Sequence, residues 1–174
     1  MEKLLSRRIA DVPASFIREI LKVAGQPGII SFAGGLPNPS LFPVEAIRSA
    51  TEAVLEGEGH AALQYGLTEG HAPLREWIAQ RYRKRFGIDI PVEQILITNG
   101  AQQALDLLGK VLLDPKDGVV LEDPGYLGAI QAFTLYQPRL LPVPLHPDGI
   151  DTEQLAQRLR RDSPKLLYTV PNFQ

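Results

Sequence analysis

The chain has 174 residues, of which 44% are hydrophobic and 22% charged, and its formal net charge is -2. These values are typical of a folded domain, so they exclude a disordered chain and give no support to nucleic acid as a partner. The absence of cysteine excludes disulfides, thiolate metal sites and a cysteine nucleophile, and it makes the cytoplasm the default location. No apolar run is long enough to cross a bilayer, so no membrane association is expected.

The first third of the chain predicts a helix, a constrained loop and a second helix. Apolar residues recur at helical spacing from Pro13 to Ala24. The segment "IISFAGGLPNPSLFP" follows, and after a brief strand-like start its paired glycines and its prolines exclude regular structure. A helix is then expected from about Val44 to Glu56.

A third helix is expected from about His71 to Phe86, after the irregular connection "HAALQYGLTEG". Gly87 is a plausible end for this helix in a left-handed conformation. The basic run from Arg81 to Arg85 falls in its last turns. The negative end of the helix and plain solvation explain that run better than nucleic acid does.

From Gln94 onward, strand-like and helix-like segments alternate. Strands are expected at "QILIT", "GVVLE", "RLLPV" and "KLLYTV", and helices at Ala101 to Leu113, Tyr126 to Leu135 and Thr152 to Arg161. Such alternation predicts an α/β fold, a mostly parallel sheet with flanking helices in three layers. Asp151 and Gln154 fit a capping box before the last helix, with Ile150 and Leu155 at staple positions.

The start of the helix after "QILIT" is a candidate binding site. In an open α/β sheet this helix start lies at the carboxyl end of a strand, where free amide groups and the helix dipole attract an anion. Gly100 would let a phosphate approach the backbone, and Gln102 could add a side-chain donor. The alternative is that Asn99 or Thr98 simply caps the helix. Neither a Walker A motif nor a GxGxxG fingerprint is present, so a phosphate here would belong to a different cofactor.

Five segments in order extend over essentially the whole chain: "SFAGGLPNPSLFP", "LQYGLTEGHAPLRE", "ILITNGAQQALDLL", "LEDPGYLGAIQAF" and "LYTVPNFQ". Together they resemble the fold-type I pyridoxal-phosphate enzymes, specifically class I/II aminotransferases of the aminoadipate and kynurenine type. The resemblance implies the N-terminal part of the PLP-transferase fold, incomplete here. Residues 1–45 would form an N-terminal helix and substrate-side loop, and residues 46–174 the first part of the large cofactor-binding α/β domain.

The resemblance also assigns cofactor contacts. Gly100, Ala101 and Gln102 would hold the phosphate of pyridoxal 5′-phosphate, and Tyr126 would stack against its pyridine ring. Many relatives have serine where this chain has Ala101, so one hydroxyl donor would be missing and backbone N–H groups would serve instead.

Further roles follow from the same resemblance. Tyr65 would reach the cofactor phosphate of the neighbouring subunit, which implies a homodimer. Gly34 and Gly35 would lie beside the substrate carboxylate, and Arg18 near an acidic substrate side chain.

Three groups that such enzymes need lie later in the sequence than residue 174: the Schiff-base lysine, the aspartate beside the pyridine nitrogen and the arginine that binds the substrate α-carboxylate. We therefore expect no catalytic residue in this chain, and we expect an N-terminal portion of a longer enzyme that is inactive alone. The whole enzyme would transfer an amino group between an amino acid and a 2-oxo acid.

Other functions remain open. One is the cofactor-binding effector domain of a transcription regulator, although only about a dozen residues precede the matched region, too few for a winged-helix module. Another is a non-transaminating lyase or decarboxylase on the same scaffold. A nucleotide-binding doubly wound protein is disfavoured by the missing glycine fingerprint. The histidines His60, His71 and His146 lack paired ligand spacing, so no metal site is expected.

Overall fold

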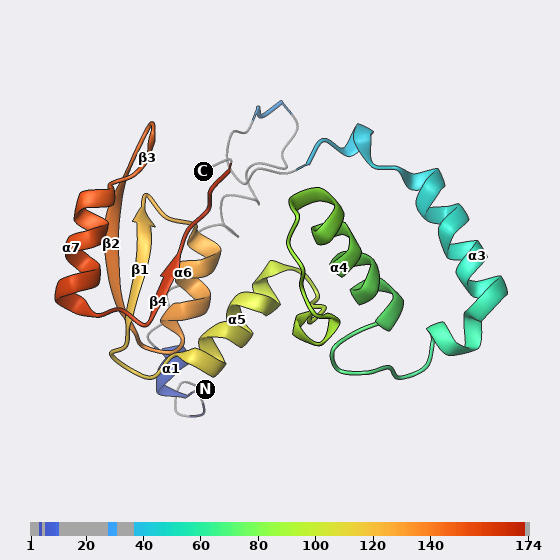
Figure 1. Cartoon of the computed structure of the whole chain (residues 1–174), viewed down its shortest axis with the longest axis horizontal. Helices are drawn as coiled ribbons and strands as arrows, with labels where there is room; N and C mark the ends of the chain where they lie inside the picture. The colour runs from blue at the N-terminus through green and yellow to red at the C-terminus, as the bar shows by residue number, and fades with distance from the viewer. Residues whose placement is uncertain (1–3, 5, 11–27, 31–36, 173–174) are drawn as a thin grey trace. The chain divides into compact units, whose positions relative to one another are not determined.

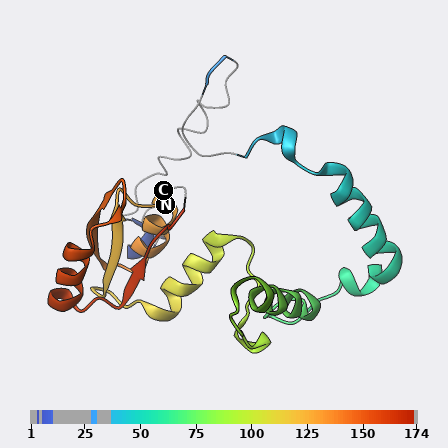
Figure 2. The same ribbon diagram turned by 45° about the horizontal axis from the view of Figure 1, so that its top comes forward.

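The structure is a computed structural model that describes residues 4, 6–10, 28–30 and 37–172 (Figure 1). The chain divides into two compact units, one formed by Met1–Pro13 and Thr98–Gln174 and the other by Ala14–Ile97. Figure 2 shows the same ribbon from a second direction. No described helix combines the length and the apolar character that crossing a membrane requires.

The first unit is built on a four-stranded sheet in the order β3-β2-β1-β4. Its strands are β1 (Gly118–Asp123), β2 (Arg139–His146), β3 (Gly149–Ile150) and β4 (Leu166–Tyr168). β1 pairs in parallel with both β2 and β4, so that Val120 lies opposite Leu141 and Leu167. Only the short β2–β3 pair is antiparallel. The expectation of a mostly parallel sheet is therefore confirmed.

Helices lie on both faces of this sheet, and their bounds fall close to those expected. They are α5 (Ala101–Leu112), α6 (Leu127–Thr134) and α7 (Thr152–Asp162), with the short α1 (Arg7–Ala10) in the same unit. Val119 and Leu121 of β1 pack with residues of α5 and α6, including Leu105 and Phe133. Val120, which points the other way, packs with Leu155 of α7. Alternation along β1 thus creates two cores and three layers.

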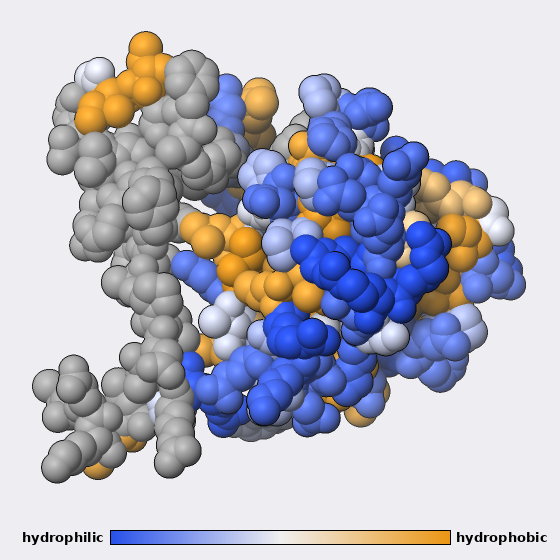
Figure 3. Space-filling model, turned by 90° about the vertical axis from the view of Figure 1, so that its left-hand side faces the viewer, coloured by the Kyte–Doolittle hydropathy of each residue, from blue (hydrophilic) through white to orange (hydrophobic). Residues whose placement is uncertain are grey.

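The outer surface of α7 is polar. Figure 3, seen from the side that carries α7, shows mainly hydrophilic residues on this face. Leu155 faces the sheet, whereas Glu153, Gln157 and Arg160 are exposed. This arrangement is the amphipathic pattern of a helix that covers a sheet from outside.

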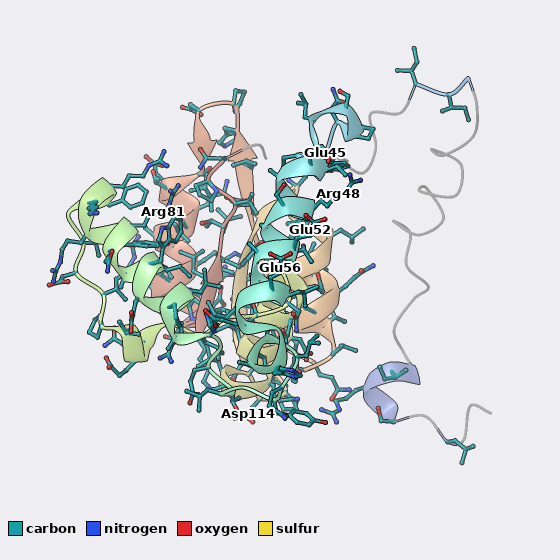
Figure 4. All side chains as sticks on the ribbon, turned by 90° about the vertical axis from the view of Figure 1, so that its right-hand side faces the viewer. Glu45, Arg48, Glu52, Glu56, Arg81 and Asp114 are labelled. Carbon is teal, nitrogen blue, oxygen red and sulfur yellow. The ribbon has the colours of Figure 1, made fainter. Side chains whose placement is uncertain are left out.

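The second unit contains helices without a sheet among its described residues. Its elements are η2 (Pro39–Leu41), α3 (Val44–Ala62), α4 (Ala72–Phe86) and η3 (Val92–Gln94). α4 ends as predicted, because Gly87 has a φ of 68° and its N–H bonds to the carbonyl of Arg83. α3 runs further than expected because a second helical stretch follows a kink at Glu58. Figure 4 shows Glu45, Arg48, Glu52 and Glu56 along α3.

The strand predicted at "QILIT" is wrong. Val92–Gln94 form a 3-10 turn, and residues 95–98 belong to no strand. The N–H of Ile97 donates instead to the carbonyl of Glu69 at 3.0 Å. A strand needs a neighbour to complete its hydrogen bonds, and no strand occurs in the described part of residues 14–97.

Two other expectations concern the beginning of the chain. The helix predicted from Pro13 to Ala24 lies outside the described residues. Of the strand-like start of the following loop, Ile29 and Ile30 are described, and they are exposed and in no strand.

Candidate functional site

The start of α5 has a backbone conformation that favours glycine. Gly100 is the residue before the helix, with φ 81° and ψ 169°. A Cβ atom placed there would meet no other atom within 4 Å. Gly100 is therefore required by its conformation, and the space above it is open to a ligand.

No described side chain caps the N–H groups of the first turn of α5. The hydroxyl of Thr98 donates to the carbonyl of Gly100 at 3.2 Å, and the N–H of Asn99 donates to the Gln103 side-chain oxygen at 2.6 Å. Capping by Thr98 or Asn99, the alternative explanation for these residues, is thus not what the structure contains. The first turn also carries no acidic residue, so the positive end of the helix dipole is not neutralised there.

Tyr126 stands at the start of α6, directly after β1. The connection contains a cis peptide bond between Asp123 and Pro124. The carbonyl of Tyr126 accepts the N–H groups of Ala129 and Ile130, and its side chain is 43% exposed. An aromatic ring that is fixed at its base and open on one side is suited to stacking against a flat ligand.

The starts of α5 and α6 are joined by one side chain. The Nε2 amide of Gln102 donates to the carbonyl of Gly128 at 3.1 Å. The ring of Tyr126 lies over the same glycine, since a Cβ at Gly128 would fall 2.7 Å from its ring atoms. The structure therefore brings Gly100, Ala101, Gln102 and Tyr126 to one place. The side-chain amide of Gln102 is held by this bond, which uses one of its two N–H donors, while the backbone N–H of Gln102 lies in the uncapped first turn.

The carboxyl end of β4 is attached to the same edge of the sheet. The carboxylate of Glu122 is nearly buried and accepts the N–H of Val170 at 3.1 Å. The ring of Tyr168 contacts Phe133 edge-on, with 5.9 Å between the ring centroids. Burial raises the pKa of the Tyr168 phenol above its ordinary value, and the neighbouring Tyr126 and Glu122 add to this shift.

Sequence reasoning did not assign a role in the site to Tyr168 or Gly128. Tyr168 lies in the second half of the predicted strand "KLLYTV", close to the ligand-binding edge, which is the signal that could have identified it. Gly128 follows Tyr126 by two residues, but the sequence contains no sign that the ring folds back over it.

The other predicted site residues are placed differently. Tyr65 belongs to the second unit and its side chain is fully exposed. Arg18, Gly34 and Gly35 lie outside the described residues. Within the described part of the chain, no three histidine, aspartate or glutamate side chains gather where they could hold a metal ion.

Comparison with known proteins identifies the family. The family model "Aminotransferase class I and II" matches residues 33–170. A 2-aminoadipate transaminase from Thermus thermophilus is 50% identical over 163 residues, which cover 94% of this chain and 40% of that protein. A more distant match, 31% identical over 92% of this chain and 34% of its own length, is an uncharacterized HTH-type transcriptional regulator from Escherichia coli.

Solved structures give the same result. The kynurenine aminotransferase of Pyrococcus horikoshii, in complex with PMP, has a TM-score of 0.88 and 44% identity, covering 99% of this chain and 44% of that one. The α-aminoadipate aminotransferase of Thermus thermophilus, complexed with N-(5′-phosphopyridoxyl)-L-leucine, has a TM-score of 0.85 and 46% identity, covering 99% and 41%.

The predicted resemblance is confirmed by these matches, and so is the cofactor at the level of the family, since both solved relatives carry a form of pyridoxal phosphate. The chain spans between 40% and 44% of the length of these aminotransferases. Because the family model matches residues 33–170, most of its length, the chain belongs to the class I and II aminotransferases.

Proposed function

We propose that this chain supplies the phosphate-binding and ring-binding part of a pyridoxal-phosphate-dependent aminotransferase, which transfers an amino group between an amino acid and a 2-oxo acid. The observation that supports this function best is the uncapped start of α5 at Gly100, tied through Gln102 and Gly128 to the ring of Tyr126. An anion-binding helix end next to an open aromatic ring matches a phosphorylated aromatic cofactor.

The residues present fit the phosphate of this cofactor. Its negative charge is stabilised at a helix start by N–H donors and by the helix dipole. Ala101 and Gln102 would provide these donors from the backbone, which makes the hydroxyl that Ala101 lacks dispensable. The N–H of Gly100 donates to the carbonyl of Thr98 at 2.9 Å, so Gly100 would hold the phosphate by letting it approach the backbone closely. Tyr126 would lie against the pyridine ring and hold it in one plane. When bound, pyridoxal phosphate supplies the electron sink for removal of the substrate α-proton.

The rest of the proposal concerns the whole enzyme. Tyr65 would reach the cofactor phosphate of a second subunit in a homodimer, and Gly34, Gly35 and Arg18 would contact the substrate. The lysine that binds the cofactor covalently would not be among residues 1–174, so this chain alone would be inactive. The division into residues 1–45 and 46–174 and a cytoplasmic location belong to the same proposal.

Cofactor titration tests the phosphate site. Pyridoxal phosphate should bind saturably, and pyridoxal without the phosphate should bind at least about tenfold more weakly, because charge-assisted hydrogen bonds are lost. Gly100→Ala should weaken binding about tenfold, since alanine disfavours a φ of 81°. Gly59→Ala, at a helical position with no atom within 4 Å, is the matched control. Equal affinity for the phosphorylated and unphosphorylated compounds would contradict the proposed site.

Borohydride reduction tests the position of the lysine. Reduction of the cofactor-loaded chain should leave no specific covalent label on residues 1–174, as read by peptide mass spectrometry. A stoichiometric label on one lysine of this range would show that the chain holds its own covalent attachment point.

A regulatory domain is the second candidate function, favoured by the match to the HTH-type regulator. Such a domain could use the same phosphate and ring contacts to sense the cofactor. An amino-transfer assay of the whole protein separates the two functions, and product analysis in the same assay identifies a lyase or decarboxylase.

A further inference from the structure

We propose that Gly128 is a positioning residue that seats the ring of Tyr126 and thereby sets where the ring meets the cofactor. This inference rests on the proposed function, in which Tyr126 stacks against pyridoxal phosphate. It adds a residue for which neither the family resemblance nor the sequence pattern gives a role.

The geometry around Gly128 leaves no room for a side chain. A Cβ atom there would lie 2.7 Å from both Cε1 and Cζ of the Tyr126 ring and 2.8 Å from its hydroxyl oxygen. Carbon atoms that are not bonded to each other prefer about 3.5–4.0 Å, so the ring would have to move. The ring occupies the volume that any other residue at position 128 would fill.

Backbone conformation does not explain this glycine. Gly128 lies in the first turn of α6, and it is not among the glycines with positive φ. Alanine forms helices better than glycine does. The contact with Tyr126 therefore accounts for the absence of a side chain, whereas at Gly100 the positive φ does.

Gly128 also connects the ring to the phosphate-binding helix. Its carbonyl accepts the side-chain amide of Gln102 at 3.1 Å, and Gln102 lies in the first turn of α5. At this one buried residue, the ring of Tyr126 occupies the space that a side chain would fill, and the carbonyl accepts the side chain of Gln102 from the proposed phosphate site. A shift of the α6 start would change the distance between the two contacts that hold the cofactor.

A second glycine of the same unit offers a matched control. A Cβ at Gly109, near the other end of α5, would lie 2.6 Å from the ring of Tyr136. Tyr136 is held within the protein, because its hydroxyl lies 2.8 Å from the Asp106 carboxylate. Gly109→Ala therefore creates a comparable clash with a tyrosine that has no part in the proposed site.

The test is a double-mutant cycle on Gly128→Ala and Tyr126→Ala. Binding of pyridoxal phosphate is titrated, circular dichroism of the bound cofactor reports its stacking geometry, and the melting temperature of the cofactor-free protein reports folding. Gly128→Ala should weaken binding about tenfold and change the dichroism. In the Tyr126→Ala background it should have no further effect, because the clashing ring is gone. Gly109→Ala should lower the melting temperature without changing affinity.

The outcomes separate this inference from the proposed function. Unchanged affinity and dichroism in Gly128→Ala, or an equal loss in the Tyr126→Ala background, would overturn the role of Gly128 alone. Failure of the unsubstituted protein to bind pyridoxal phosphate would overturn the proposed function, and the role of Gly128 with it. If Gly128→Ala does not fold, Gln102→Met provides a second test, because it removes the hydrogen bond to the Gly128 carbonyl without adding a clash. Unchanged dichroism of the bound cofactor in Gln102→Met would then refute the role of Gly128.

Discussion

The two units differ in what they bury. Every buried hydrophobic side chain of the described structure lies in the sheet-containing unit, between Leu105 and Val143. In residues 37–97 the only buried residue is Arg75, while large apolar side chains such as Ile47, Trp77 and Phe86 are exposed. A sheet with helices on both faces encloses apolar surface from two sides, whereas α3 and α4 form helices without enclosing a core.

The sheet-containing unit is stabilised by tertiary packing, whereas the described features that stabilise the second unit are mostly local to its helices. Helix ends such as Gly87 and ion pairs such as Glu45–Arg48, at 2.9 Å, are local features and are present without a core. Such features stabilise a helix weakly, by less than about 1 kcal/mol for an exposed pair. We therefore expect the cooperative unfolding of the protein to report the sheet-containing unit.

The largest expected effect comes from Phe133→Ala. Phe133 has no exposed surface and packs between α5 and β1. Its truncation should lower the free energy of unfolding by about 3–5 kcal/mol in urea denaturation. Trp77→Ala, at a side chain that is 55% exposed, should cost less than about 1 kcal/mol. Similar losses for both variants would show that the second unit has a core of its own.

An intermediate effect is expected for Arg75→Ala. The guanidinium of Arg75 donates to the carbonyls of Ile95, at 2.9 Å, and Val92, at 2.7 Å, and so attaches η3 to α4. Its loss should destabilise this attachment locally by about 1–3 kcal/mol, seen as faster amide hydrogen exchange in residues 92–97. Global unfolding should change little. Arg81→Ala, an exposed arginine of the same helix, is the control, and unchanged exchange in Arg75→Ala would rule out the anchor.

The smallest expected effect is on the stability of the fold at acidic pH. The ammonium of Lys165 lies 2.8 Å from the Asp117 carboxylate, and this hydrogen bond is the main cause that holds the pKa of Asp117 below its ordinary value of 3.8. A carboxyl whose pKa is lower in the folded state stabilises the fold above its unfolded pKa, and this stability is lost as pH falls through the folded pKa.

Asp117→Asn should therefore reduce the fall in melting temperature below about pH 4. The measurement is a series of thermal melts from neutral to acidic pH. Asp148→Asn is the control, since no ion pair of Asp148 is found among the described residues. If the melting temperature of Asp117→Asn depends on pH as that of the unsubstituted protein does, the ion pair between Lys165 and Asp117 does not stabilise the pairing of β4 with β1.

Much of the sheet-containing unit could be predicted from the sequence, because its signals are local and agree with one another. The cap of α7 is an example: the Asp151 carboxylate accepts the N–H of Gln154 at 2.9 Å. The capping box itself is only half formed. The N–H of Asp151 bonds to the carbonyl of Pro144 at 2.9 Å, so the Gln154 side chain donates to the Asp151 carboxylate instead.

What depends on distant partners could not be predicted. The run Ile95 to Ile97 has the composition of a buried strand, but composition does not supply a neighbouring strand. The site divides in the same way. Gly100 and Tyr126 could be expected at one edge because a parallel strand is predicted before each of them, but only Tyr126 follows a strand in the structure. The bond from Gln102 to Gly128 joins the two helix starts, and it depends on how closely α5 and α6 pack.

The amide groups at the start of α5 have a consequence for mutagenesis. Main-chain atoms are the same in every residue except proline, so a library of side-chain replacements at Ala101 would leave the N–H groups of the proposed phosphate site in place. Gly100 differs from Ala101, because its φ of 81° is a conformation that glycine adopts readily and other residues rarely adopt. A saturation screen would therefore find that Gly100 does not tolerate substitution whereas its neighbours do. Such a screen would overlook the proposed site, because its donors are backbone N–H groups.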